Sequence, residues 1–236
     1  ITERKKAEQI LKENETHLKE LNNTKDKLFS VIAHDLRSPF NGILGFSELL
    51  QNNIQNLKVE DAERWISQIS FTAKHTLNLL ANLLEWAKTQ TGQIDYIPKN
   101  LKLLPILEDI VNVLNSSAKI KNISLTIIKP EDIIVHADFN MLNTILRNLI
   151  SNAIKFTPIG GKVEIIVTPF KGQVEIIIKD NGIGMDDETK ANLFKMDNRT
   201  TIEGTANEKG SGLGLIICKE FIKKLGGEIE VASELG

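Results

Sequence analysis

The first part of the chain, to about Gly92, carries polar and apolar positions at the spacings of long helices. Near its start, apolar residues are sparse and a few polar residues share their face. The a and d positions of one heptad frame are filled by Leu11, Leu18, Leu21, Leu28 and Ile32, with Asn14 and Lys25 on the same seam. This frame predicts a coiled coil whose polar seam residues fix the register. A solvated amphipathic helix is the alternative that the charged residues allow.

A helical hairpin is predicted next. The first helix should continue through residues 29–50 with Pro39 inside it, where a proline removes a backbone donor and bends the helix. Polar residues at 51–58 predict a turn, and a second helix is predicted over 59–89. Its apolar stripe consists of Ile66, Ile69, Ala73, Leu77, Leu80, Leu84 and Ala87. Two such helices leave half of each stripe uncovered, so we expect two hairpins to pair in a homodimer as a four-helix bundle.

From about Asn100 the pattern changes to short β-branched runs alternating with amphipathic helices. Helices are predicted over 103–118, after Asp138 as N-cap, and in the stretch closed by Gly226 and Gly227. Strands are predicted at Ile123–Ile128, Ile133–Val135, Val163–Val167, Val174–Ile178 and Ile229–Val231, with Gly172 in a hairpin turn. This mixture predicts a two-layer α/β sandwich, so the whole chain is expected to be α+β.

Composition narrows the classes of function. A formal net charge of -2 argues against a nucleic-acid binder held by bulk positive charge. Cys218 is the single cysteine, so an internal disulfide is excluded and a reducing compartment fits. No apolar run reaches the ~18 residues that span a membrane, and no signal peptide is present. We expect a cytoplasmic segment without membrane contact, from a parent protein that could be anchored elsewhere.

His34 is the first candidate for chemistry. Asp35 follows it directly, and Ser38 and Pro39 come one turn later. A nucleophilic imidazole needs one nitrogen free and the proton of the other held by an acceptor, which a neighbouring carboxylate could provide. A lone histidine on a helix usually has no such role, so this motif alone does not decide.

Asn148 and Asn152 form a second candidate site. They lie one helical turn apart on the same face, with Lys155 on the next turn. Asparagine oxygens suit a hard cation such as Mg²⁺, which keeps water and phosphate oxygens as its other ligands. A solvated helix face is the alternative explanation for these residues.

Two glycine-containing segments are further candidates. Asp180 ends an apolar run and could accept a hydrogen bond from an exocyclic amine, while Gly182 and Gly184 allow a sharp turn close to a ligand. A plain turn after a strand is the alternative. Residues 210–215 place glycines before a helix, where free N–H groups suit phosphate. Neither a Walker A motif nor a dinucleotide fingerprint fits them, and the polar residues 195–209 before them are expected to form a mobile lid.

The order and spacing of these four motifs resemble the H, N, G1 and G2 boxes of two-component sensor histidine kinases over nearly the whole chain. The resemblance implies a coiled-coil signalling helix over 1–28, a dimerisation and histidine phosphotransfer domain over 29–92, and a Bergerat-type catalytic ATP-binding domain over 93–236. The last is an α/β sandwich, in which the family has one more strand than this chain, so a truncated C-terminal strand is expected. Residues 1–5 resemble the tail that follows a PAS sensor domain.

The resemblance also implies roles for individual residues. His34 would be the phosphoacceptor, Asp35 its orienting base, and Ser38 stands where Thr or Asn is usual, which leaves phosphatase activity open. The nucleotide would be bound by Asn148, Asn152, Lys155, Phe156, Asp180, Gly182, Gly184, Phe194, Gly210, Gly212, Gly214 and Leu215. Mg²⁺ would be held by Asn152 with help from Asn148. Phe156 replaces a frequent Tyr, and Arg199 receives no role.

The implied reaction is autophosphorylation of His34 with ATP and Mg²⁺, followed by transfer to an aspartate of a response-regulator receiver domain. The linker near 92–98 is the expected hinge between the helical and ATP-binding parts. A non-catalytic dimeric scaffold is one rival. An ATPase related to chaperones or topoisomerases is another, but it would carry an acidic residue where Asn148 stands. The stimulus, the cognate regulator, a hybrid parent and cis or trans transfer stay open.

Overall fold

The computed structural model describes residues 9, 11–12, 14–16, 19, 36–53, 57–90, 96–128, 133–170, 172–195, 203–206, 208 and 214–236. Predictions for most of the coiled-coil frame and for His34, Asp35, Gly210 and Gly212 therefore lie outside the described residues. The chain divides into two compact units, 1–83 and 84–236. The domain boundaries expected at residues 28 and 92 stay predictions.

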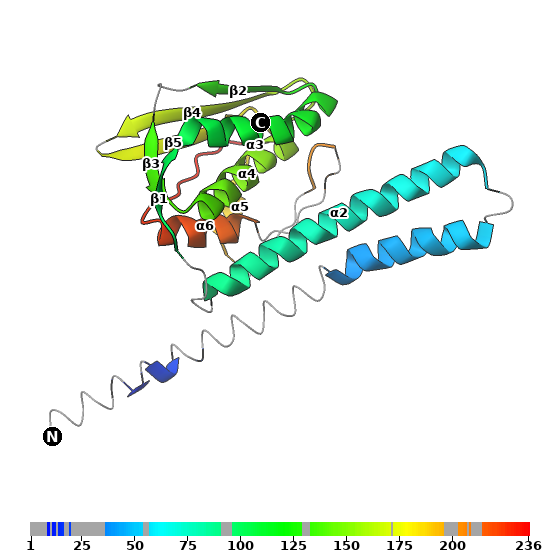
Figure 1. The fold of residues 1–236 in the computed structure, drawn as a ribbon, viewed down its shortest axis with the longest axis horizontal. Helices are drawn as coiled ribbons and strands as arrows, with labels where there is room; N and C mark the ends of the chain where they lie inside the picture. The colour runs from blue at the N-terminus through cyan, green and yellow to red at the C-terminus, as the bar shows by residue number, and fades with distance from the viewer. Residues whose placement is uncertain are drawn as a thin grey trace. The chain divides into compact units, whose positions relative to one another are not determined.

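The first unit contains a helical hairpin. Residues 36–53 are helical, and α2 (Val59–Gln90) runs back alongside them (Figure 1). Pro39 lies within the first of these helices, as expected, although the helix continues to Asn53 rather than ending at residue 50. Glu60 and Asp61 lie in the first turn of α2, where negative charge favours the positive end of the helix dipole.

The predicted apolar stripe of α2 is largely exposed in a single chain. Ile66 is 55%, Leu77 66% and Leu84 56% exposed, and the facing helix also exposes apolar side chains at Phe40 and Leu44. Exposure of this size along one helix agrees with the expectation that one hairpin cannot cover its own stripe.

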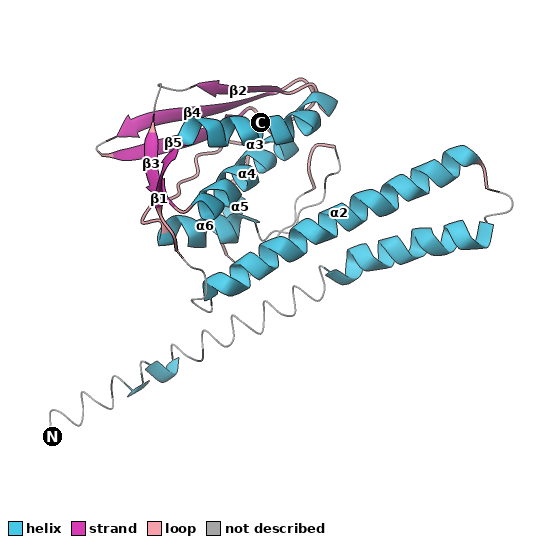
Figure 2. Ribbon diagram, in the orientation of Figure 1, coloured by secondary structure: helices cyan, strands magenta, loops and turns pink. Residues whose placement is uncertain are grey.

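The second unit mixes helices and strands as predicted (Figure 2). Its elements are β1 (Lys99–Lys102), α3 (Leu103–Ile120), β2 (Ser124–Ile128), β3 (Ile134–Ala137), α4 (Phe139–Phe156), β4 (Lys162–Phe170), β5 (Gln173–Asp180), α5 (Asp187–Asn192) and α6 (Gly214–Lys224). β1 pairs antiparallel with β3, and a second sheet has the order β2-β4-β5. β4 and β5 form the expected hairpin, and Gly172 in its turn has a φ of 79°.

Helices and sheet enclose one apolar core. α3 contributes Leu103 and Leu107, and α4 contributes Leu146 and Ile150, all almost fully buried. Alternate residues of β4 are buried in the same cluster, as the period of a strand requires: Val163, Ile165 and Val167. The two-layer α/β sandwich predicted for this part of the chain is confirmed.

Two expectations need correction. β1 was not predicted, because three of its four residues are polar and its pattern carries no strand signal. The strand predicted at Ile229–Val231 is wrong, since residues 227–236 contain no strand. A β-branched run becomes a strand only with a neighbour for its backbone groups. Here Gly236 instead donates to the Ile183 carbonyl at 3.2 Å, and Ser233 Oγ accepts from the Met185 N–H at 2.9 Å.

Asp138 fixes the start of α4. One carboxylate oxygen accepts from the backbone N–H groups of Asn140 and Met141, at 2.9 and 3.1 Å, which confirms the predicted N-cap. The other oxygen accepts from the Ile97 N–H at 3.1 Å. The end of the expected 92–98 hinge is thus attached to the helix that carries the candidate cation ligands.

Candidate functional site

The second half of α4 is the centre of the candidate site. Its apolar face is buried in the core through Ile150 and Ile154, whereas Asn148, Asn152 and Lys155 are half-buried. The structure therefore places the two amides one turn apart on the same face, as the spacing predicted.

The end of α4 is capped by three separate segments. An α-helix leaves its last four carbonyls without partners inside the helix. Here Ala153 O accepts from Thr157, Lys155 O accepts from the Thr205 N–H, and Phe156 O accepts from the Ile183 N–H at 3.1 Å. Loops that follow β5 and precede α6 are thus attached directly to the helix that carries the polar residues.

The side chain of Asn148 carries a buried hydrogen-bond donor. Its Nδ2 is buried and has no hydrogen-bond partner among the described residues. A Cβ added to Gly214 would lie 3.2 Å from Asn148 Oδ1, so the first residue of α6 approaches this amide closely. A buried donor left unpaired costs about 1–3 kcal/mol, which a ligand acceptor could recover. Rotating the amide would present its oxygen instead, so this group can serve either a phosphate or a cation.

Cys218, on α6, lies next to the side chain of Asn148 on α4. Its thiol donates to the Ile145 carbonyl at 3.8 Å. Burial raises the pKa of the Cys218 thiol to about 12, although the adjacent Asn148 amide favours the thiolate. A neutral thiol is a weak acceptor, so a contact with Cys218 satisfies the Asn148 donor poorly. Cys218 therefore acts here as an unreactive packing residue.

The loop after β5 has little room for side chains. Asp180 is exposed, and its Oδ1 accepts from the Gly182 N–H at 2.9 Å. A Cβ on Gly182 would lie 2.7 Å from Phe156 O. Gly184 has a φ of 66°, and a Cβ there would collide with the backbone of Glu234. Gly182 is thus required for the close packing of this loop on α4, and Gly184 for its close packing on residues 234–235. The loop presents the Asp180 carboxylate to solvent.

Lys155 is a half-buried cation at the end of the polar face. Its Nζ lies 4.6 Å from the centre of the Phe156 ring, within the range of a cation–π contact. Burial lowers the pKa of Lys155, and the negative charges of Glu208 and Glu203 oppose that shift. A positive group so placed suits an anionic ligand held beside the two asparagines.

The remaining predicted residues are placed as follows. Phe194 lies in the turn after α5, and Lys219 Nζ of α6 is 5.5 Å from its ring centre. Gly214 and Leu215 form the first turn of α6. Ser38 is exposed on the helix 36–53 of the first unit.

Three residues of the second unit were not singled out from the sequence. Lys121, Thr205 and Glu208 meet at the end of α4 through hydrogen bonds between residues 84 and 87 positions apart. In the sequence, Gly204 and Thr205 followed by Glu208 could have indicated a turn before the glycine-rich segment. Nothing in the sequence around Lys121 indicates that it contacts this turn. Residues 203–206 and 208 belong to the stretch expected to be a mobile lid, and they are attached to α4 instead.

Cation binding would depend on the asparagines. No group of three or more His, Cys, Asp or Glu side chains capable of holding a metal occurs within the part of the chain that the structure describes. Asparagine oxygens together with phosphate and water remain a suitable ligand set for Mg²⁺. None of the described helices is long and apolar enough to cross a membrane.

Two family models match the chain. Residues 24–92 match the His Kinase A (phospho-acceptor) domain, and residues 137–236 match the histidine kinase-, DNA gyrase B- and HSP90-like ATPase. The chain belongs to the sensor histidine kinases. The predicted family and the predicted order, a helical region followed by an α/β ATPase-type domain, are confirmed.

Known histidine kinases resemble the chain in sequence and fold. The autoinducer 2 sensor kinase/phosphatase LuxQ of Vibrio vulnificus strain YJ016 is 32% identical over 222 residues, covering 90% of this chain and 25% of LuxQ. Full-length ShkA in complex with AMPPNP is 26% identical with a TM-score of 0.60, covering 88% of this chain and 42% of ShkA. Histidine kinase ThkA, solved with the response regulator TrrA, is similar in fold, with a TM-score of 0.63 at 21% identity, over 85% of this chain and 55% of ThkA. The chain spans about a quarter of the length of the curated relatives such as LuxQ.

Proposed function

We propose that this histidine kinase segment uses ATP and Mg²⁺ to phosphorylate its own His34. The observation that supports this best is the polar face of α4. Asn148, Asn152 and Lys155 lie on a helix whose end is capped by the loops on either side. The same chain matches a phospho-acceptor domain over residues 24–92. A triphosphate-binding surface and an acceptor histidine in one chain favour autophosphorylation over simple hydrolysis.

The residues on α4 fit a magnesium nucleotide. Asn152 would ligate the cation with help from Asn148, whose buried amide donor has no hydrogen-bond partner among the described residues and fits a ligand acceptor. Lys155 would contact phosphate oxygens, and Phe156 would pack against the base. When bound, the magnesium nucleotide supplies the phosphoryl group and the charge that neutralises its oxygens.

The glycine segments would complete the nucleotide site. Asp180 would accept a hydrogen bond from the adenine amine, with Gly182 allowing its loop to lie against α4 and Gly184 allowing it to lie against residues 234–235. Phe194, in the turn after α5, would mark the start of the segment over the nucleotide. Gly210, Gly212, Gly214 and Leu215 would offer backbone N–H groups to the phosphates.

His34 would receive the phosphoryl group on a ring nitrogen. Phosphoryl transfer depends mainly on positioning and charge neutralisation, so the chain's task is to bring the imidazole in line and hold its second N–H through Asp35. Ser38 would lie one turn away on the same helix. The linker at 92–98 would allow the approach of the two parts.

We also propose two partners. A second copy of the chain would cover the exposed stripe of α2, which agrees with the match to a dimerising phospho-acceptor domain. An aspartate on a response-regulator receiver domain would take the phosphoryl group, as the ThkA complex with TrrA suggests for that kinase. The divisions 1–28, 29–92 and 93–236 describe the signalling helix, the acceptor domain and the ATP-binding domain in this proposal.

Labelled ATP tests the reaction directly. The chain is incubated with γ-labelled ATP and Mg²⁺ beside His34→Gln, Asn152→Ala and the matched control His136→Gln, which changes an exposed histidine paired with Asn100. We expect acid-labile label on the wild type and on His136→Gln alone. Equal label on His34→Gln would refute the acceptor assignment, and absence of label from every protein despite bound ATP would support the scaffold rival.

A further inference from the structure

Lys121 is a buried lysine outside the residues assigned above. It ends α3, and its side chain is only 5% exposed. A buried ammonium loses its hydration and is tolerated only where acceptors replace the water. The position of those acceptors therefore shows what the side chain holds together.

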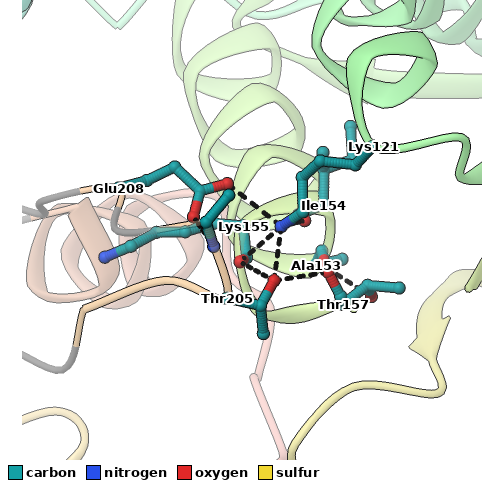
Figure 3. Close-up of polar contacts among 8 residues, drawn as sticks. Lys121, Ala153, Ile154, Lys155, Thr157, Thr205 and Glu208 are labelled. Carbon is teal, nitrogen blue, oxygen red and sulfur yellow. Dashed lines mark hydrogen bonds and ion pairs between the residues drawn. The ribbon is translucent and has the colours of Figure 1, made fainter. Parts of the chain in front are cut away.

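Four oxygens surround Lys121 Nζ (Figure 3). On α4, the carbonyls of Ile154 and Lys155 lie 2.8 and 2.9 Å away. On the loop before α6, Thr205 Oγ1 and Glu208 Oε1 lie 2.6 and 3.0 Å away. An ammonium has three N–H donors, so every donor has an acceptor and one is shared. Its positive charge also suits the negative end of the α4 dipole.

The loop depends on the same contacts. Glu208 uses one carboxylate oxygen for Lys121 and the other for the Ala206 N–H at 2.8 Å, while its carbonyl accepts from the Gly204 N–H at 2.8 Å. Burial acts to raise the pKa of Glu208, but hydrogen bonds from Ala206 and Lys121 lower it below its usual value. Glu208 is therefore held as a carboxylate that binds back to Gly204 and Ala206, and we call residues 203–206 and 208 the turn.

Thr205 joins this turn to α4. Its hydroxyl accepts from Lys121 and donates towards the carbonyls of Thr157, at 2.7 Å, and Lys155, at 3.2 Å. Its backbone N–H donates to the same Lys155 carbonyl at 3.1 Å. A Cβ on Gly204 would collide with the Glu208 carboxylate, so the turn fits tightly. The Lys121 ammonium therefore contacts both sides of this junction.

We propose that Lys121 is a positioning residue that fastens residues 203–206 and 208 to the end of α4 and so sets the affinity for the nucleotide phosphates. This rests on the proposed ATP site. The link is direct, because Lys121 holds the carbonyl of Lys155, whose ammonium is proposed to contact the phosphates, and Glu208 places a negative charge near that ammonium. Loosening the turn would move both charges.

The fold does not need the Lys121 side chain for its turn between α3 and β2. That turn is held by backbone bonds, in which Lys121 O accepts from the Gly160 N–H at 2.9 Å and the Ile123 N–H donates to Ala118 O at 2.8 Å. A methionine keeps the length and apolar stem of the lysine while removing its charge. Lys121→Met should therefore release the junction while leaving the sheet and core in place.

The test uses Lys121→Met with Lys119→Met as the matched control, since Lys119 is exposed two residues earlier on α3. Amide hydrogen exchange is measured at Thr205 and Ala206, with the amides of β4 as internal reference. We expect exchange at Thr205 and Ala206 to accelerate about tenfold in Lys121→Met and to stay unchanged in Lys119→Met. Uniform acceleration that includes β4 would overturn the proposal, because it would indicate loss of general stability.

Kinetics supply the second readout. The KM for ATP of Lys121→Met should rise about tenfold while the rate at saturating ATP stays within about twofold, because the junction acts on binding. An equal fall of kcat and kcat/KM would overturn the positioning role, because it would indicate an effect on the chemical step rather than on binding. An unchanged KM despite faster exchange at Thr205 and Ala206 would overturn it as well. If the wild type binds ATP but does not label His34, the proposed kinase function fails, and the dissociation constant of ATP replaces KM.

A variant on the other side of the junction covers the case in which Lys121→Met does not fold. Glu208→Gln keeps the shape of the side chain and removes its charge. We expect faster exchange at Ala206 and weaker ATP binding, with the exposed Glu228→Gln unchanged as the control. Unaltered exchange at Ala206 in Glu208→Gln would contradict the proposal.

Discussion

Replacing Gly182 by alanine tests whether the loop after β5 must lie against α4 for nucleotide binding. The added Cβ would lie 2.7 Å from Phe156 O and 3.1 Å from Phe156 C, and 2.6 Å from Asp180 Oδ1. Carbon atoms prefer separations of about 3.5–4.0 Å, so the loop must move by several tenths of an ångström or more. Overpacking of this kind costs about 1–3 kcal/mol.

The movement also acts on the ligand site. It stretches the 2.9 Å hydrogen bond from the Gly182 N–H that orients Asp180. If about 1.4–2.8 kcal/mol of the strain is relieved only by displacing the loop, the affinity for ATP falls about 10- to 100-fold. The core lies elsewhere on α4, so the global free energy of unfolding should change less than the binding free energy.

Calorimetric titration with a non-hydrolysable ATP analogue measures the effect, with thermal unfolding beside it. Gly45→Ala is the matched control, because a Cβ at this helical position meets nothing within 4 Å. Alanine is favoured over glycine in a helix by about 0.5–1 kcal/mol, so this control should be neutral or stabilising. Binding by Gly182→Ala within twofold of the wild type would refute the steric argument.

Four further predictions concern single side chains. The affinity for ATP should weaken as the pH rises towards 10.5, and the loss should begin at a lower pH than for an ordinary lysine, because burial lowers the pKa of Lys155. Titration calorimetry across pH 8–10.5 measures this affinity, and a flat profile would contradict the prediction. Cys218 should resist thiol reagents at pH 8 until the protein is denatured, because burial raises its pKa to about 12, and rapid labelling of the native protein would contradict this. Asn148→Ala should change the free energy of unfolding by no more than about 1 kcal/mol, since an unpaired donor is removed, yet weaken ATP binding at least about tenfold. Leu77→Glu should convert a dimer to a monomer in light scattering while Lys74→Glu, also exposed, does not, and a dimeric Leu77→Glu would argue against the α2 interface.

The long helices and the central hairpin could be predicted from the sequence because their signals are local. The apolar spacing of α2 and the Asp138 cap of α4 predicted helices that the structure contains. The β4–β5 hairpin followed from two β-branched runs around Gly172. The same reasoning failed at Ile229–Val231, because a strand requires a neighbouring ladder that no local pattern guarantees.

Some residues of the candidate site could likewise be predicted from local sequence, and others could not. Asn148, Asn152 and Lys155 could be predicted as a group, because i and i+4 positions share a helix face whatever the rest of the chain does. The junction at Lys121 could not, since its partners Thr205 and Glu208 are more than 80 residues away in sequence. A lysine at the end of a helix is normally exposed, and only the folded chain shows that this one is buried.

The two oxygens of Asp138 have a consequence for sequence divergence. As a helix cap alone, aspartate, asparagine, serine and threonine are close to interchangeable. Here one oxygen caps α4 and the second accepts the Ile97 N–H. Asparagine offers an amide NH2 donor instead of that second acceptor, and the hydroxyl residues offer one oxygen for both tasks. Neutral drift at this position should therefore be restricted to aspartate among homologues that keep the linker attached, whereas homologues with a free linker should sample all four residues.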